Sequence, residues 1–210
     1  MHNLPYTPFA QPFYGSPIGL RGPGVPKGVV PPPAGPVAER ELNVMRHVAA
    51  NRDPVSDQWA TYMNERGDKE MWFDVAKQYR QVAGFTRGWL GTGLMAVAMG
   101  VTSLQSNAVK KFYNRPRPYQ YDPSIAPYGN LPKDGAYPSG HTSSAAAAAT
   151  VMGALWPQRA GEFQELARQV GYARVYSGMH YPSDVIVGAR LGRRTAVNLM
   201  SPLLRGRFEG

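Results

Sequence analysis

Three short segments of the sequence carry side chains that can bind a phosphate group or react with it. They are Lys110 with Arg117 seven residues later, Pro138-Ser139-Gly140-His141, and Arg174 followed by His180 and, four residues further on, Asp184. Cationic side chains and free backbone N–H groups bind phosphate oxygens, and an imidazole oriented by a carboxylate can act as a nucleophile or a base. Together the residue types predict phosphate binding beside a histidine that is a candidate nucleophile or base.

The segment Ser139-Gly140-His141 stands directly before an alanine-rich run. This order predicts the start of a helix, where the first backbone N–H groups have no partner within the helix. Such an end attracts anions through these N–H groups and the positive end of the helix dipole. A simple helix cap with an exposed histidine is the alternative interpretation of this segment alone.

The spacing of His180 and Asp184 suggests direct cooperation. Pro182 is a natural first residue of a helix, so His180 would lie just before its start and Asp184 in its first turn, within reach of the imidazole. A carboxylate bonded to one ring nitrogen fixes the tautomer and leaves the other nitrogen free to react. Taken alone, these two residues also fit an ordinary surface pair, and the basic residues at Lys110 also fit dipole compensation at a helix end.

The elements that must position these residues are predicted to be helices, because no stretch shows the alternation of a strand. The predicted helices are 37–51, 54–66 with Asp53 as cap, 69–83 with Asp68 as cap, 86–114, 141–156, 159–177 and 182–204. In the third, a core stripe is predicted from Trp72, Val75, Ala76, Tyr79 and Val82. We expect an all-α bundle over residues 37–210 as a single domain, with one long loop at 115–140 and a Pro/Gly-rich extended arm at 1–36.

Composition narrows the function classes. The net charge of +9 favours anionic partners, but no nucleic-acid-binding motif accompanies it, so we expect no nucleic acid and leave peripheral contact with an anionic membrane open. The chain has no cysteine and four histidines, which argues against a metal site. No secretory signal is evident. The uncharged stretch 88–109 is long enough to span a bilayer, but a buried central helix is the preferred interpretation. These features predict a soluble protein in the cytoplasm, possible membrane contact aside.

The three segments together resemble the signature of the type 2 phosphatidic acid phosphatase superfamily, which also contains class A nonspecific acid phosphatases and vanadium-dependent haloperoxidases. The matching positions are Lys110, Arg117-Pro118, Pro138-Ser139-Gly140-His141, Arg174, His180 and Asp184. Ala173 stands where the family often has serine, and a rival alignment on Arg115-Pro116 fails because it would need a lysine at Ala108. The resemblance covers residues 86–195 and implies the helical bundle shared by these phosphatases and haloperoxidases.

The resemblance also implies roles for the individual residues. His180 would attack phosphorus and form a phosphohistidine, oriented by Asp184, while His141 would protonate the leaving oxygen and later activate water. The phosphate oxygens would be held by Lys110, Arg117, Ser139, Gly140 and Arg174. No metal and no cofactor is expected for this reaction.

Two other functions and the substrate stay open at this stage. In a haloperoxidase the same residues would bind vanadate, with His180 coordinating vanadium, and a non-enzymatic binder of phosphate or lipid headgroups is a third possibility. The expected partner is a phosphorylated small molecule or an amphiphile such as a prenyl phosphate. A tyrosine-rich loop would suit an amphiphile or would simply pack, and it comprises Tyr113, Tyr119, Tyr121, Tyr128 and Tyr137. The oligomeric state is left open.

Overall fold

The computed structural model describes residues 25–205, and it describes side chains as far as residue 202. Within this range the chain is all helical and contains no strand, which confirms the predicted fold class. The helices are α1 (Pro36–Ala50), α2 (Pro54–Arg66), α3 (Glu70–Ala83), α4 (Phe85–Tyr113), α5 (Pro118–Tyr121), α6 (Gly140–Leu155), α7 (Ala160–Tyr176) and α8 (Pro182–Arg205), with a 3₁₀ turn at Pro157–Arg159.

The helix boundaries lie close to those expected from the sequence, with two differences. Asp53 caps α2 as predicted and accepts hydrogen bonds from the amides of Val55 and Ser56. The prediction of Asp68 as the cap of α3 is wrong, because Lys69 occupies that position and no side chain caps the helix. The loop expected over residues 115–140 also contains the single helical turn α5.

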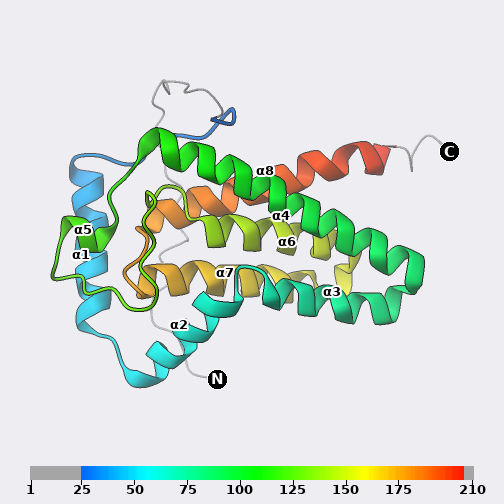
Figure 1. Cartoon of the computed structure of the whole chain (residues 1–210), viewed down its shortest axis with the longest axis horizontal. Coiled ribbons are helices and arrows are strands. Elements are labelled where there is room, and N and C mark those ends of the chain that lie inside the picture. The colour runs from blue at the N-terminus through cyan, green and yellow to red at the C-terminus, as the bar shows by residue number, and fades with distance from the viewer. Residues whose placement is uncertain (1–24, 206–210) are drawn as a thin grey trace.

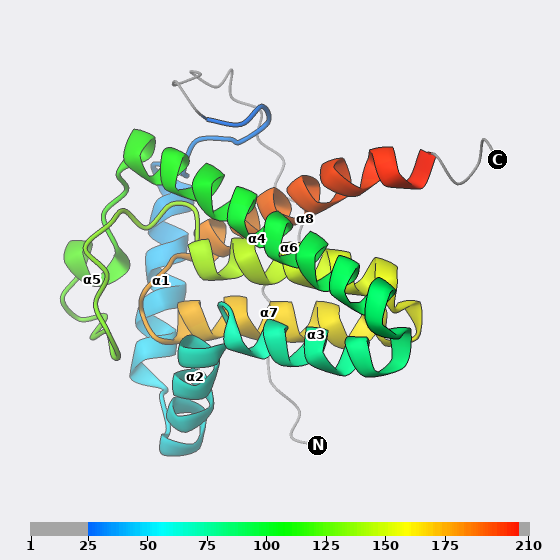
Figure 2. The same ribbon diagram turned by 45° about the vertical axis from the view of Figure 1, so that its right-hand side comes forward.

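Helix α6 lies at the centre of the bundle and packs against α4, α7 and α8 (Figures 1 and 2). Its alanine run, Ala145–Ala149, is buried. Helix α8 approaches it closely, since a β-carbon on Gly192 would lie 2.0 Å from the carbonyl oxygen of Ser143. A β-carbon on Gly188 would lie 2.7 Å from the carbonyl oxygen of Ser139, so both positions of α8 require glycine.

Helix α3 contributes most of its predicted core stripe. Trp72, Val75, Ala76 and Tyr79 are buried, and the Trp72 indole donates a hydrogen bond of 3.0 Å to the carbonyl of Gly67. Val82 is 64% exposed, so its place in the stripe was predicted wrongly. In the last turn of α3, Val82 therefore faces away from the core, while Ala83 packs against it.

Helix α4 is buried along one face only. Met95, Ala98 and Val109 face the core, whereas Leu90 and Leu104 are 70% and 73% exposed. The prediction of a buried central helix at 88–109 is therefore wrong, and α6 occupies that place. No helix in the described part of the chain is long and apolar enough to cross a membrane.

The segment 25–35 contains no helix or strand, and residues 1–24 of the expected arm lie outside the described residues. Val25 and Val29 pack against a small apolar cluster that includes Tyr137. The Tyr137 hydroxyl donates a hydrogen bond of 2.5 Å to the carbonyl of Val30. Residues 25–35 therefore contact the chain immediately before Pro138-Ser139.

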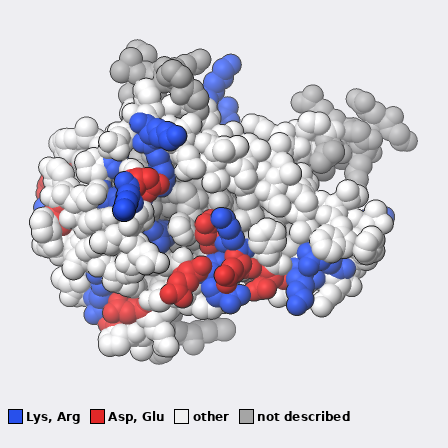
Figure 3. Space-filling model, viewed as in Figure 1, with Lys and Arg blue, Asp and Glu red and all other residues white. Residues whose placement is uncertain are grey.

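Charged side chains of both signs are interspersed on the face shown in Figure 3, which carries no continuous basic patch. Arg66, for example, forms ion pairs with Glu70 and Asp74. The net positive charge of the chain is thus not gathered at one place on this face.

Candidate active site

The predicted site residues meet at one end of the bundle. The carboxyl ends of α4 and α7 and the amino ends of α6 and α8 lie together at the left of Figure 1, beside the loop that joins α5 to α6. These ends bring together Lys110 in the last turn of α4, His141 near the start of α6, Arg174 in the last turn of α7 and His180 just before α8. Three segments distant in sequence thus form one site.

His180 is buried and has a defined tautomer. Its Nδ1 lies 2.7 Å from the carbonyl oxygen of Ala136, which can only accept a hydrogen bond, so Nδ1 carries the proton. Arg117 Nη1 lies 3.2 Å from Nε2, and a guanidinium can only donate, so Nε2 presents its lone pair. Burial, and then the positive charges of Arg117 and Arg174, hold the pKa of His180 well below its usual value. The ring is therefore neutral at neutral pH, with Nε2 facing the cationic side chains.

Asp184 lies beside His180 without forming the expected hydrogen bond. Its Oδ2 is 3.5 Å from His180 Nδ1, and the ring hydrogen goes to Ala136 instead. Asp184 Oδ2 accepts from the amide of Tyr181 at 2.9 Å, and Oδ1 accepts from Arg115 at 2.6 Å. Burial raises the pKa of Asp184 to about 7, against the opposing effect of Arg115. Asp184 therefore fixes the turn before α8 through its contacts with Tyr181 and Arg115.

A buried ion-pair network holds Asp184 in place. Arg115 donates from Nη1 to Asp184 and from Nη2 to Glu41 at 2.9 Å, and its guanidinium lies 3.7 Å from the centroid of the Tyr181 ring. Glu41, in α1, also accepts hydrogen bonds from the amide and the hydroxyl of Ser183. Helix α1 is thus tied to the first turn of α8.

Replacing Glu41 by glutamine is expected to destabilise the fold by about 3 kcal/mol, because half of the charge around the buried Arg115 is lost. Chemical denaturation followed by circular dichroism measures this change in the free energy of unfolding. Glu39→Gln in the same helix is the control, since Glu39 is exposed and pairs only with the half-exposed Arg46. Equal stability of the two variants would contradict a structural role for the network.

In addition to burial, three cationic side chains lower the pKa of His180 through their charge, and they are Arg117, which contacts Nε2, Arg174 and Lys110. Arg117 is almost fully buried and donates from Nη1 to the carbonyl of Met179 at 2.9 Å. Arg174 donates to Asn64 of α2 at 2.8 Å, and its buried Nε has no partner among the described residues. Burial lowers the pKa of Arg174 to about 10, and burial also lowers that of Lys110. Arg174 therefore remains positively charged at neutral pH, and Lys110 forms an ion pair with Asp134, so the site is rich in cationic groups.

The start of α6 completes an anion-binding surface. Ser139 caps the helix, because its hydroxyl lies 2.9 Å from that of Thr142 and accepts from the Thr142 amide. The amides of Gly140 and His141 have no acceptor among the described residues. A β-carbon on Gly140 would lie 3.9 Å from Lys110 Nζ, so the absence of a side chain keeps the space beside this lysine open.

His141 is the second histidine of the site. Burial, and then the charge of Arg174, lower its pKa to about 4, while Asp68 has the opposite effect. His141 is therefore neutral in the ligand-free site at neutral pH. A bound phosphate dianion would offset the neighbouring cations, so binding should raise this pKa and favour uptake of a proton. Asp68, which does not cap α3, instead contributes charge near His141 and Arg174.

The structure brings all eight predicted site residues to the same end of the bundle, although Ser139 serves the helix cap. Sequence analysis missed several neighbours of the site, which are Glu41, Asn64, Arg115, Asp134 and the carbonyl of Ala136. Of the loop tyrosines, Tyr137 is fully buried and Tyr128 packs edge-on against Tyr176, while Tyr121 is exposed. Packing within the protein therefore accounts for Tyr137 and for the half-buried Tyr128.

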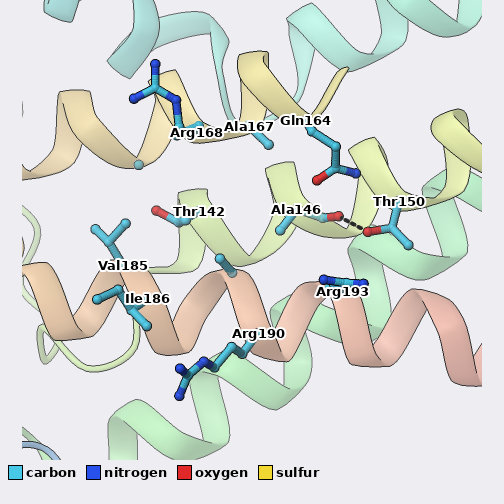
Figure 4. Close-up of a pocket in the computed structure, with 12 residues that line it drawn as sticks. Thr142, Ala146, Thr150, Gln164, Ala167, Arg168, Val185, Ile186, Arg190 and Arg193 are labelled. Atoms are coloured by element: carbon cyan, nitrogen blue, oxygen red, sulfur yellow. Dashed lines mark hydrogen bonds between the residues drawn. The ribbon is translucent and has the colours of Figure 1, made fainter. Parts of the chain in front are cut away.

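No cluster of three or more metal-ligating side chains was found within residues 25–202. A cavity of about 350 Å³ lies elsewhere, between α6, α7 and α8 (Figure 4). Arg168, Arg190 and Arg193 line it, and none of the eight predicted site residues does. The site around His180 is thus separate from this cavity.

A buried neutral histidine beside three cationic side chains at one end of a helical bundle is the central feature of this site. Residues 91–203 match the family described as the PAP2 superfamily, so the chain belongs to that superfamily. This match confirms the resemblance found in the sequence.

Curated relatives are similar over part of their length. A non-specific acid phosphatase of Salmonella typhi is 37% identical over 40% of this chain and 36% of its own. A lipid A 1-phosphatase of Rhizobium johnstonii is 32% identical over 50% of this chain and 44% of its own. A decaprenylphosphoryl-5-phosphoribose phosphatase of Mycobacterium tuberculosis is 36% identical over 50% and 56%. The chain thus spans about a third to a little over half of these relatives.

Solved structures share the fold at low identity. A transmembrane PAP2-type phosphatidylglycerolphosphate phosphatase from Bacillus subtilis aligns with a TM-score of 0.63 and 20% identity, covering 82% of this chain and 88% of its own. A bacterial vanadium-dependent iodoperoxidase aligns with a TM-score of 0.71 and 21% identity, covering 83% and 52%. Both branches named by the sequence resemblance are thus represented among proteins of this fold.

The expectation of a cytoplasmic protein, at most in peripheral contact with a membrane, is contradicted by these comparisons. The Bacillus subtilis protein of the same fold is transmembrane, and the relatives include phosphatases of lipid A. Composition and the lack of an evident signal segment were therefore insufficient grounds for assigning a compartment.

Proposed function

We propose that this protein is a metal-independent phosphatase that hydrolyses phosphate esters through a phosphohistidine intermediate. The observation that supports this most is the state of His180, whose Nε2 lone pair faces Arg117 while Nδ1 is committed to Ala136. A neutral imidazole next to cations is a nucleophile prepared for an anionic phosphoryl group. The phosphatases among the curated relatives agree with this activity.

In the first step, His180 Nε2 attacks phosphorus, and the bond between phosphorus and the ester oxygen breaks. His141, having taken up a proton when the anion bound, gives this proton to the departing oxygen. In the second step, His141 removes a proton from water, the resulting hydroxide oxygen bonds to phosphorus, and the P–N bond breaks. Inorganic phosphate leaves, His141 releases the proton it took from water to the solvent, and both histidines return to their neutral states.

The cations supply what a metal ion supplies in other phosphoryl-transfer enzymes. Charge develops on the equatorial oxygens in the transition state and must be stabilised by fixed positive groups. Lys110, Arg117 and Arg174, whose Nε has no partner among the described residues, would supply this charge together with the amides at the start of α6. The charge on the resulting phosphohistidine is countered by Asp184 at 3.5 Å from the ring.

We propose a phosphorylated amphiphile or small molecule as the substrate. The relatives whose names state a substrate act on lipid A and on decaprenylphosphoryl-5-phosphoribose, and both are phosphates on a lipid or prenyl group. Because another relative is a non-specific acid phosphatase, the proposal also includes small phosphate monoesters as substrates. A screen of aryl phosphates, prenyl phosphates and phosphatidic acid distinguishes these substrate classes.

Haloperoxidase activity is the second candidate, supported by the fold shared with the iodoperoxidase. Vanadate would occupy the phosphate position, with His180 Nε2 available as its ligand and the same cations around its oxygens. Halide oxidation by peroxide that depends on added vanadate would favour this candidate.

Phosphatase activity is expected to survive EDTA and to be inhibited by vanadate. Protein cations provide the charge stabilisation, so chelation removes nothing that the reaction needs, whereas vanadate adopts the five-coordinate geometry of phosphoryl transfer. Initial rates with an aryl phosphate, measured with and without each reagent, check both statements. Activity lost in EDTA and restored by a divalent cation would overturn the mechanism.

A further inference from the structure

The carboxylate of Asp134 is hydrogen-bonded to two of the cationic side chains proposed to bind phosphate, Lys110 and Arg117. Asp134 Oδ2 accepts a hydrogen bond of 2.5 Å from Lys110 Nζ, and Asp134 Oδ1 accepts one of 2.7 Å from Arg117 Nη2. The two oxygens of this side chain thus lie where two oxygens of a bound phosphate would receive the same donors. No sequence motif of the site includes this residue.

Asp134 is the most accessible member of this ion-pair cluster. Its side chain is 48% exposed, whereas those of Lys110 and Arg117 are 9% and 1% exposed. Contacts that do not involve its carboxylate hold the backbone around Asp134. The Asp134 carbonyl accepts a hydrogen bond from Arg117 Nε at 3.1 Å, and the amide of Ala136 donates to the carbonyl of Arg115 at 2.8 Å. A rotation of the side chain alone can therefore uncover the cations without opening the loop.

Arg117 does not need Asp134 to keep its position, because it also donates to the carbonyl of Met179. A tetrahedral anion has contacts that the carboxylate does not make. Within the described part of the chain, Arg174 Nε has no partner and the amides of Gly140 and His141 have no acceptor. An anion with three or more oxygens can use these donors in addition to the two that Asp134 occupies, so it has the means to displace the carboxylate.

We propose that Asp134 is an internal competitor for the phosphate site, which covers Lys110 and Arg117 in the resting protein and rotates away when a phosphate group binds. Two anions cannot share these donors at such short distance, because like charges disfavour one another's ionised forms. Asp134 thereby acts as a specificity-determining residue, since weakly charged ligands with few oxygens do not displace it. This inference rests on the proposed function of the same site.

The binding consequence is quantitative. If only the uncovered form binds, the apparent dissociation constant is the intrinsic one divided by the uncovered fraction. Removal of the carboxylate should therefore tighten binding of inorganic phosphate, by about tenfold if the uncovered fraction is on the order of a tenth. The Michaelis constant for a phosphate ester should fall in parallel, with a smaller change in kcat.

The test is titration calorimetry of the full chain with inorganic phosphate, and separately with vanadate, for the wild type, Asp134→Ala and Asp134→Asn. The expected order of affinity is Asp134→Ala, then Asp134→Asn, then the wild type, because asparagine keeps an acceptor but loses the charge. Glu65→Gln is the control for net charge, since Glu65 is exposed and forms no ion pair with the described residues. Its phosphate affinity should equal that of the wild type.

Thermal denaturation of each variant establishes that it is folded. Phosphate affinity in folded Asp134→Ala that is equal to or weaker than that of the wild type would overturn the proposal. So would a fall in kcat at unchanged KM, which is the result expected if Asp134 only positions the cations. If the wild type shows no phosphatase turnover while Asp134→Ala still binds phosphate more tightly, the proposed activity is wrong. The proposal that Asp134 competes with phosphate for Lys110 and Arg117 is then supported on its own.

Discussion

Replacing His180 by alanine is expected to abolish the phosphoenzyme and to lower the rate of ester hydrolysis by at least about 10⁴-fold. The variant loses the only atom proposed to bond to phosphorus, and the chain contains no cysteine that could replace it. Rapid alkaline quench with a radiolabelled aryl phosphate retains phosphohistidine on the protein, and acid treatment of the quenched sample then releases this acid-labile label. The wild type should show such label during turnover, and His180→Ala should show none.

His47→Ala is the matched control for this experiment. His47 is exposed on α1 and makes only local contacts with Asn51, so its loss should change neither labelling nor rate. Because His180 is fully buried, the folded state of its variant must be verified by circular dichroism. Acid-labile label on a folded His180→Ala protein would place the nucleophile on another residue.

Replacing His141 by alanine is expected to separate substrates by their leaving groups. An alkyl or prenyl phosphate, whose leaving oxygen is strongly basic, should lose about 10³-fold in the rate of its first step, since general acid catalysis typically contributes 10² to 10⁴. An aryl phosphate needs little protonation to depart and should lose only about tenfold in that step. Single-turnover kinetics with one substrate of each kind measures the difference.

The second step gives an independent readout for His141. This residue also serves as the base that activates water, so phosphohistidine should accumulate in His141→Ala when an aryl phosphate is supplied. Quench experiments over a time course detect this accumulation. Equal losses for both substrates, with no accumulated intermediate, would contradict the assignment of His141 as acid and base. Label that is present in His180→Ala and absent in His141→Ala would reverse the two roles.

The helices could be predicted because their boundaries are set by local chemistry. Pro54 after the capping Asp53, and Pro182 at the start of α8, act within one helical turn, so the sequence alone reveals them. Val82 was misassigned because helical spacing does not tell where a neighbouring helix ends and solvent begins. The pattern of α4 was ambiguous for the same reason, since an apolar residue such as Leu104 follows the helical period whether or not anything packs on it.

The site residues could be located because the three segments together match a family signature in order and spacing. Their partners could not be located in this way. Glu41 reaches Ser183 across 142 residues, and Arg115 reaches Asp184 across 69, and no local pattern marks such contacts. Ala136 contributes a backbone carbonyl, which any residue would supply. Asp134 resembles any acidic residue of an exposed loop until the fold places it on Lys110 and Arg117.

The ion pairs that tie α1 to the first turn of α8 have a consequence for exchanging parts between relatives. The family match begins at residue 91, yet Glu41 and Asn64, which hold Arg115 and Arg174, come from helices before it. A segment cut at the start of the match would carry the complete signature and leave two of its buried arginines without those acceptors. The smallest segment that can be transplanted intact therefore begins before α1. A chimaera that joins this core to the leading helices of another member needs a carboxylate in place of Glu41 and an amide in place of Asn64.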